Sequence, residues 1–161
     1  MMKVDDRIFL IGFMGVGKSY LGKKIADQLD KAFYDIDLEI EKKAALPVNE
    51  IFSLHGEKYF RDLESDIILN WEADGIIATG GGIILDERNR EFLKLSKHKV
   101  VWLNPSWEII LSRIENSYRP IVLDRTNYEL YRLWEERQTY YNECADVIFK
   151  GSDQGKLIDI L

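Results

Sequence analysis

The stretch "IGFMGVGKSYLGKKIA" (residues 11–26) indicates the end of a strand, a glycine loop and the start of a helix. Gly12, Gly17, Lys18 and Ser19 complete the pattern G-x-x-x-x-G-K-[ST] of a phosphate-binding loop. Glycines let consecutive backbone N–H groups turn toward an anion, and the helix start adds partial positive charge. The alternative is a chance glycine turn with an N-capping serine. The strand before the loop and the helix after it favour a nucleotide triphosphate site, with Lys18 at the β- and γ-phosphates and Ser19 on Mg²⁺.

Outside this loop, short apolar runs alternate with longer amphipathic segments, which is typical of strand–helix–strand units around a parallel sheet. The strands that we expect are residues 7–13, 31–37, 75–79, 99–104 and 145–150. The helices that we expect are residues 18–29, 38–44, 48–54, 57–72, 105–115, 127–144 and 156–161. Pro105 suits the first turn of the fifth of these helices. Residues 116–126 show no periodicity and contain Arg119 and Arg125, so we expect a functional lid there.

The composition limits the classes of function. The chain has 161 residues, which fits one domain over residues 1–161. Its net charge of −6 argues against a general nucleic-acid-binding protein, which is usually basic. Cys144 is the only cysteine, so an intramolecular disulfide is impossible and a reducing compartment fits. No apolar run approaches the roughly 18 residues of a membrane span. The N-terminal "MMKVDDR" lacks a signal-peptide core, so we expect a cytoplasmic protein with no membrane partner.

Two carboxylates follow the second expected strand. Asp35 and Asp37 stand at its carboxyl end, the edge at which open parallel sheets bind ligands. One residue separates them, so they point to different sides and can serve different purposes. One could hold the Mg²⁺ shell while the other meets a substrate hydroxyl. The alternative is an Asx turn in which Asp37 caps the next helix. The phosphate-binding loop nearby favours the chemical interpretation.

The third expected strand ends in "TGGG" (residues 79–82), which indicates that the backbone approaches a ligand closely there. Three arginines are further candidates. Arg61 stands three residues before Glu64, so an ion pair between them could hold its guanidinium in place. Arg119 lies in the expected lid and Arg137 on the long helix. Each of these residues alone is more often a solvated surface charge, and their spacing does not show whether they converge.

Taken together, "GFMGVGKS", "FYDID", "GEKYFRDLE", "ATGGG", "RPIVL" and "RQTYYNECAD" resemble the shikimate kinase family, in its order and close to its spacing. The resemblance implies a P-loop, nucleoside-monophosphate-kinase-like α/β domain of three layers. Its five-stranded parallel sheet has the order 2-3-1-4-5, with a lid at about residues 113–126. It also implies a Mg²⁺-dependent monomer that transfers the ATP γ-phosphoryl group to the 3-hydroxyl of shikimate. The products are ADP and 3-phosphoshikimate, on the chorismate route to aromatic amino acids.

The resemblance further implies roles for individual residues. Those expected to bind ATP are Gly15, Val16, Gly17, Lys18, Ser19, Tyr20, Arg113, Arg119 and Gln154. Those expected to bind shikimate are Asp37, Arg61, Gly80, Gly81, Gly82 and Arg137. Ser19 and Asp35 are expected at the metal, and Lys18, Asp37 and Arg119 are the expected catalytic residues. Tyr20 stands where the family usually has threonine.

Other functions stay open at this point. Another small-molecule P-loop kinase, such as a gluconate-type enzyme, could also use Arg61 and Arg137, although "DID" together with "TGGG" favours shikimate. A regulatory module that binds nucleotide without phosphotransfer is a second alternative, and four intact residues argue against it: Lys18, Ser19, Asp37 and Arg119. A nucleic-acid-dependent ATPase is a third, and the acidic charge argues against that one.

Overall fold

The computed structural model describes residues 5–95, 97–115, 117–151 and 153–161. Its centre is a five-stranded, all-parallel sheet in the order β2-β3-β1-β4-β5, which confirms the expected order. The strands are β1 (Arg7–Ile11), β2 (Phe33–Asp35), β3 (Gly75–Ala78), β4 (Lys99–Leu103) and β5 (Val147–Phe149). Each strand is shorter than its expected range. The difference is clearest at β2, where the following helix already begins at Ile36.

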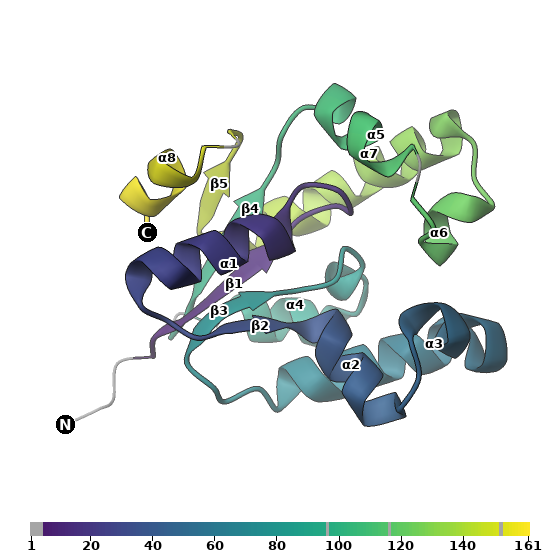
Figure 1. Cartoon of the computed structure of the whole chain (residues 1–161), viewed down its shortest axis with the longest axis horizontal. Helices are drawn as coiled ribbons and strands as arrows, with labels where there is room; N and C mark the ends of the chain where they lie inside the picture. The colour runs from purple at the N-terminus through teal and green to yellow at the C-terminus, as the bar shows by residue number, and fades with distance from the viewer. Residues whose placement is uncertain (1–4, 96, 116, 152) are drawn as a thin grey trace.

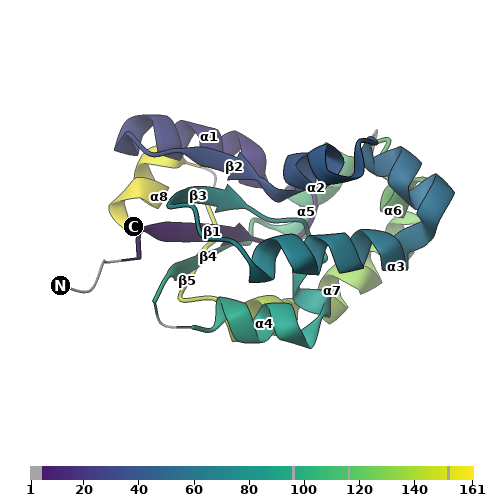
Figure 2. The same ribbon diagram turned by 90° about the horizontal axis from the view of Figure 1, so that it is seen from below.

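Helices cover both faces of this sheet, as Figures 1 and 2 show: α1 and α8 lie over one face, and α4 and α7 over the other. The helices are α1 (Lys18–Leu29), α2 (Ile36–Ala44), α3 (Val48–Leu69), α4 (Glu87–Leu93), α5 (Trp107–Ile114), α6 (Pro120–Leu123), α7 (Asn127–Cys144) and α8 (Gln154–Asp159), with a 3₁₀ turn η1 (Ile83–Leu85). Among the described residues, no helix combines the length and apolar character that crossing a bilayer requires.

Several element bounds differ from those expected. Helix α5 begins after the N-cap Ser106, so Pro105 precedes the helix and is not in its first turn. The two helices expected on either side of residue 56 form one element, α3, with a kink at Gly56, whose φ of 81° suits glycine. The sequence did not predict η1, α4 or the short helix α6 inside the expected lid.

Asp35, not Asp37, is the N-cap of α2. The backbone N–H of Asp37 donates to Oδ1 of Asp35 at 2.9 Å, as in an ordinary N-cap. The capping alternative considered for Asp37 is therefore wrong, and the side chain of Asp37 projects from the first helical turn.

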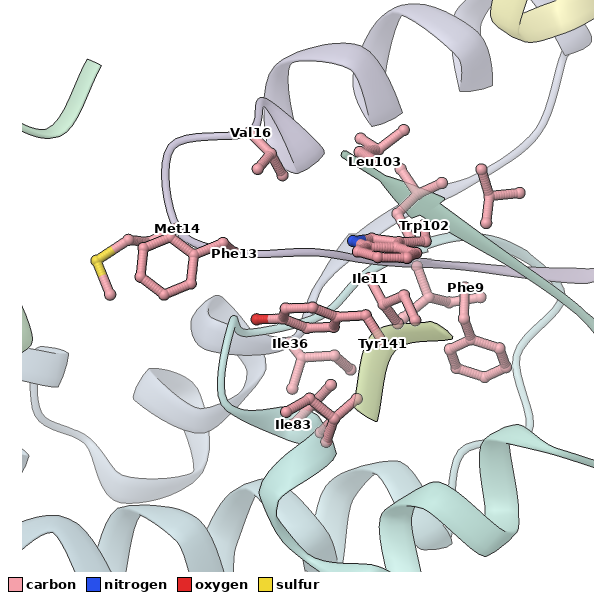
Figure 3. Packing of buried hydrophobic residues seen from close by; sticks show 14 of the residues in the cluster. Phe9, Ile11, Phe13, Met14, Val16, Ile36, Ile83, Trp102, Leu103 and Tyr141 are labelled. Atoms are coloured by element: carbon pink, nitrogen blue, oxygen red, sulfur yellow. The ribbon is translucent and has the colours of Figure 1, made fainter. Parts of the chain in front are cut away.

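The hydrophobic core packs strands β1 and β4 against helix α7. Strand β1 is buried along its whole length, as expected for a central parallel strand covered on both faces. Phe9 and Ile11 from β1, Trp102 from β4 and Tyr141 from α7 pack in one apolar cluster (Figure 3). Helix α7 contributes to it because its buried residues, Leu130, Arg137, Tyr141 and Cys144, recur at helical spacing on one face. This spacing brings the charged Arg137 to the sheet along with apolar neighbours.

Candidate active site

One cavity of about 910 Å³ lies beyond the carboxyl ends of β1, β2 and β3. Ligands of open parallel sheets bind at this edge. The cavity gathers most of the residues singled out in the sequence: Gly15, Gly17, Lys18, Ser19, Tyr20, Asp35, Asp37, Arg61, Gly80, Gly81, Gly82, Arg113, Arg119 and Arg137. Segments as distant in the chain as α1 and α7 therefore contribute to a single site.

The glycine loop between β1 and α1 forms one wall of the cavity. Gly15 and Gly17 have φ angles of 79° and 95°, a region that glycine adopts without strain, and Gly17 is the N-cap of α1. Nζ of Lys18 donates to the backbone oxygens of Gly12 and Phe13 at 2.5 and 3.0 Å. Loss of hydration, followed by the charge of Arg119, lowers the pKa of Lys18 to about 7. An anion over this helix start would complement both the helix dipole and Lys18.

Two oxygen side chains stand together at the mouth of this loop. Oγ of Ser19 donates to Oδ2 of Asp35 at 2.6 Å, which joins the first turn of α1 to the end of β2. Hydroxyl and carboxylate oxygens are the donors that Mg²⁺ prefers, and Mg²⁺ takes its other ligands from water and substrate phosphates. The pair therefore fits the expected metal position.

Asp37 faces the cavity with a carboxylate oxygen free for a ligand. Its Oδ1 is buried and has no hydrogen-bond partner within the described part of the chain. Burial, reinforced by the charge of Asp35, raises the pKa of Asp37 above its ordinary value. A buried carboxylate with an open acceptor position suits contact with a substrate hydroxyl, whose proton it could accept.

Two guanidinium groups also line the cavity. Nη1 of Arg61 donates to Oε1 of Glu64 at 2.8 Å, which confirms the ion pair expected from their spacing. Burial opposes the charge of Arg61, but the carboxylate of Glu64 keeps its pKa above the ordinary value. Arg137 is 3% exposed, and burial lowers its pKa. Among the described residues, Nε of each arginine has no partner, so a planar anion in the cavity could engage both.

The glycine triplet permits these side chains to approach the backbone. A Cβ on Gly80 would lie 2.6 Å from Oε2 of Glu64 and 3.2 Å from Oδ1 of Asp37. A Cβ on Gly82 would lie 2.4 to 2.5 Å from the guanidinium atoms of Arg61. The backbone of the triplet thus lies close to acidic and arginine side chains of α2 and α3, and the approach to a ligand expected at "TGGG" stays a prediction.

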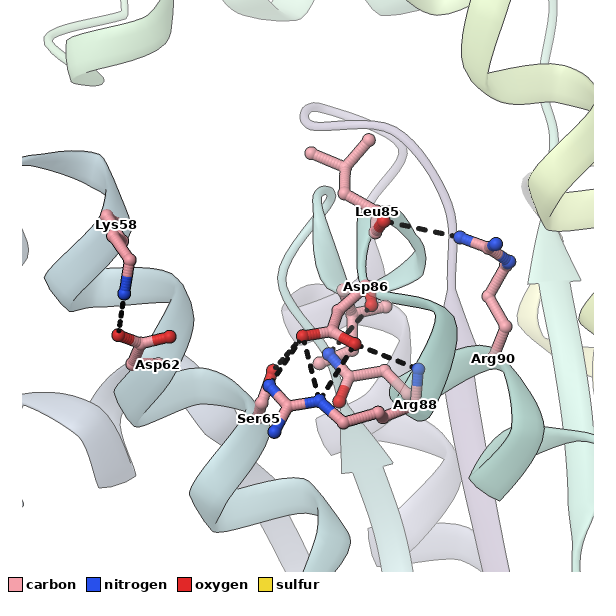
Figure 4. A network of polar contacts seen from close by, with 9 residues as sticks. Lys58, Asp62, Ser65, Leu85, Asp86, Arg88 and Arg90 are labelled. Carbon is pink, nitrogen blue, oxygen red and sulfur yellow. Dashed lines mark hydrogen bonds and ion pairs between the residues drawn. The ribbon is translucent and has the colours of Figure 1, made fainter.

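A polar network outside the cavity fixes α3 to the segment after the triplet (Figure 4). Oγ of Ser65, the residue after Glu64, donates to Oδ2 of Asp86 at 3.4 Å. Asp86 is the N-cap of α4 and also accepts from the backbone N–H of Arg88 at 2.8 Å. The side chain of Arg88 lowers the pKa of Asp86 to about 2. This network was not predicted from the sequence, although an aspartate ahead of a helical segment is a recognisable capping signal.

Sequence analysis also missed the apolar part of the cavity wall. It is formed by Pro47 and Val48 at the start of α3, by Phe52 and Phe60 further along it, and by Ile121 in α6. Because apolar residues at helical spacing usually indicate core contacts, nothing in the pattern distinguished these side chains from core residues.

Some expected site residues do not line the cavity. Val16 is 2% exposed and belongs to the core cluster. Gln154 begins α8, which packs against α1, and it is absent from the cavity wall. Arg113 does reach the loop, because its Nη1 donates to the backbone oxygen of Gly15 at 3.1 Å. Asn116, at the start of the expected lid, lies outside the described residues. The roles of Val16 and Gln154 in binding ATP stay predictions.

Comparisons with known proteins agree with this geometry. A family model described as "Shikimate kinase" matches residues 14–159 of the chain. A curated shikimate kinase from Staphylococcus aureus (strain MSSA476) is 46% identical over 140 residues, which cover 86% of this chain and 80% of the relative. The solved structure of shikimate kinase from Acinetobacter baumannii in complex with shikimate aligns with a TM-score of 0.88 at 32% identity, covering 96% of this chain and 89% of that one. Shikimate kinase from Aquifex aeolicus aligns with a TM-score of 0.81 at 34% identity, covering 96% and 92% of the two chains.

Proposed function

Because the chain belongs to the shikimate kinase family, we propose that it transfers the γ-phosphoryl group of ATP to the 3-hydroxyl group of shikimate. The products would be ADP and 3-phosphoshikimate, a step toward chorismate and the aromatic amino acids. One observation carries this proposal: the same cavity holds a phosphate-binding loop, a buried carboxylate at Asp37 and an arginine pair at Arg61 and Arg137. These are the groups that a kinase for a hydroxylated carboxylic acid needs.

The arginine pair and Asp37 would bind the two ends of the acceptor. Arg61 and Arg137 present fixed forks of N–H donors that suit the planar carboxylate of shikimate. With that end held, a ring hydroxyl comes to Oδ1 of Asp37, which is buried and open to a donor. Asp37 would orient this hydroxyl toward the γ-phosphorus and accept its proton during transfer.

On the phosphate side, catalysis depends mainly on position and on positive charge. Backbone N–H groups of the glycine loop and of Tyr20, at the start of α1, would hold the phosphates. Lys18 would move from the carbonyl oxygens of Gly12 and Phe13 to the β- and γ-phosphates. Mg²⁺ bound near Ser19 and Asp35 would neutralise charge on the same oxygens.

Residues 117–126 would act as the lid. Ser117, Arg119 and Ile121 line the same cavity as Pro47 and Phe52, so closure would bring Arg119 to the phosphates and exclude water. The need for ATP supports a cytoplasmic location. We expect a monomer in solution, as the family resemblance implies, and sedimentation analysis tests that expectation.

The test is ADP release from ATP and Mg²⁺ with shikimate, with gluconate or without an acceptor. We expect turnover with shikimate only, and a loss of about 10²- to 10⁴-fold in kcat for Asp37→Asn, the usual range for a lost general base. Asp37→Asn removes the charge and keeps the side-chain shape, so binding of ATP should persist.

Two results would contradict the proposal. Turnover with gluconate and none with shikimate would keep the kinase activity and change the acceptor. ATP binding without turnover on either acceptor would support a regulatory nucleotide-binding module instead.

A further inference from the structure

Tyr141 lies beside the acceptor side of the cavity without lining it. It stands one helical turn after Arg137 on α7 and is fully buried. Its hydroxyl donates to the backbone oxygen of Gly81, the middle residue of the glycine triplet, at 2.5 Å. Sixty residues separate the two partners in the chain, so this bond joins α7 to the loop after β3.

Packing fixes the ring that carries this hydroxyl. The ring of Tyr141 lies against that of Trp102 in β4, with centroids 5.7 Å apart and planes tilted by 32°. In Figure 3 the two rings are stacked, and the hydroxyl of Tyr141 points toward the loop that follows β3. A side chain held by a buried aromatic contact has little freedom, so its hydroxyl defines a position on the loop.

Arg137 precedes Tyr141 by four residues on α7, so both buried side chains lie on the same face of that helix. Tyr141 therefore joins the Gly81 peptide to the helix face that carries the buried Arg137. Burial raises the pKa of Tyr141 to about 12, so the phenol stays protonated and able to donate at neutral pH.

We propose that Tyr141 is a positioning residue for the acceptor, which fixes the Gly81 peptide and Arg137 relative to one another. This inference rests on the proposed function, in which the triplet and Arg137 bind shikimate. The C=O and the following N–H of a trans peptide point in opposite directions, so holding the oxygen of Gly81 also sets the direction of the Gly82 N–H. Because the triplet lines the cavity, the orientation of this peptide decides whether its C=O or its N–H faces the acceptor.

The experiment compares Tyr141→Phe with Tyr140→Phe. Tyr141→Phe keeps the ring and removes the hydroxyl, which leaves the Gly81 oxygen without its donor. The loss of one such hydrogen bond changes a binding constant by about tenfold. We expect the KM and the calorimetric Kd for shikimate to rise by about that factor, while the KM for ATP stays within about twofold. Tyr140 is the matched control, because its ring lies against the Arg90 guanidinium and is 38% exposed. Its hydroxyl should be dispensable.

The outcomes separate this inference from the proposed function. If the unmodified protein does not phosphorylate shikimate, the proposed function fails. If it does, but Tyr141→Phe binds shikimate as tightly as the unmodified protein, Tyr141 is not a positioning residue. An equal rise in both KM values together with a lower Tm would also overturn the inference, because it would indicate general destabilisation.

A second variant covers the case in which Tyr141→Phe does not fold. Tyrosine fluorinated on the ring, incorporated at position 141 alone, keeps the hydroxyl and makes it a more acidic, stronger donor. Such a protein should bind shikimate more tightly, with a Kd that falls as the hydroxyl becomes a stronger donor. A series of fluorinated tyrosines with no effect of donor strength on the Kd for shikimate would overturn the inference.

Discussion

The hydroxyl of Ser19, in the first turn of α1, donates to Oδ2 of Asp35, the last residue of β2, at 2.6 Å. The other oxygen of Asp35 accepts from the backbone N–H of Asp37. One carboxylate thus joins the phosphate-binding loop to the helix that carries the expected catalytic base. Asp35 has a structural role as a helix cap and an expected role at the metal, and the two roles can be separated experimentally.

Asp35→Asn should separate them. The amide oxygen can still accept from the Asp37 N–H, so the helix cap and the fold should persist, and the amide nitrogen in place of Oδ2 can donate to Oγ of Ser19. The lost charge weakens attraction for Mg²⁺, and we expect the Mg²⁺ concentration for half-maximal activity to rise by about tenfold. A Mg²⁺ titration at saturating shikimate measures this. Asp27→Asn, which changes an exposed aspartate on α1, is the control. An unchanged Mg²⁺ requirement in Asp35→Asn would remove Asp35 from the metal site.

Arg119→Ala should lower turnover far more than acceptor binding. Arg119 projects from the expected lid into the cavity, where its charge would stabilise the transferring phosphoryl group. We expect kcat to fall by about 10²- to 10³-fold, with the Kd for shikimate within about twofold of normal. Arg125→Ala is the matched control from the same segment, because Arg125 is exposed and its guanidinium donates to the backbone oxygen of Ile121. Equal losses in kcat and in shikimate binding would place Arg119 away from the phosphates.

Gly82→Ala should disturb the acceptor site through Arg61. The φ of Gly82 is −96°, which alanine adopts freely, so backbone strain plays no part. The added Cβ would lie within 2.5 Å of the guanidinium of Arg61 and displace it. We expect the KM for shikimate to rise by about tenfold, with the KM for ATP nearly unchanged.

A double-mutant cycle tests whether Gly82→Ala acts through Arg61. In an Arg61→Ala background the clash is absent, so adding Gly82→Ala should change the KM for shikimate little further. Fully additive effects of the two substitutions would show that Gly82 acts independently of Arg61.

Local patterns were sufficient for much of this structure. Helices α1 and α7 have the bounds that the sequence predicts, because each carries buried residues at helical spacing. The pair of Arg61 and Glu64 also followed from spacing, since residues three apart on a helix lie side by side. Such features depend on neighbours within one helical turn or within one loop.

Relations between distant segments could not be predicted in the same way. Arg61 and Arg137 come from α3 and α7, and only the packing of both helices near the sheet brings them to one cavity. The bond from Tyr141 to Gly81 spans sixty residues and leaves no periodic trace in the sequence. Helix α4 was missed because it is short, with seven residues and few apolar positions, so its periodicity is weak.

Nucleotide binding should be linked to uptake of a proton by Lys18. In the free protein the pKa of Lys18 is lowered to about 7, so the side chain is largely neutral at pH 8. Phosphate groups favour the charged ammonium form and raise that pKa. Between pH 7 and the raised pKa, binding therefore takes up a proton, and the affinity for nucleotide falls as the pH rises.

Calorimetry of MgADP binding at pH 8, in buffers of different ionisation enthalpy, measures this uptake. We expect a value approaching about one proton for the unmodified protein. Lys18→Arg keeps a positive charge whose pKa is too high to titrate here, so it should bind without that contribution. Protonation of the nucleotide itself is common to both proteins and cancels in the comparison. Equal uptake by the two proteins would mean that Lys18 is already charged before nucleotide arrives.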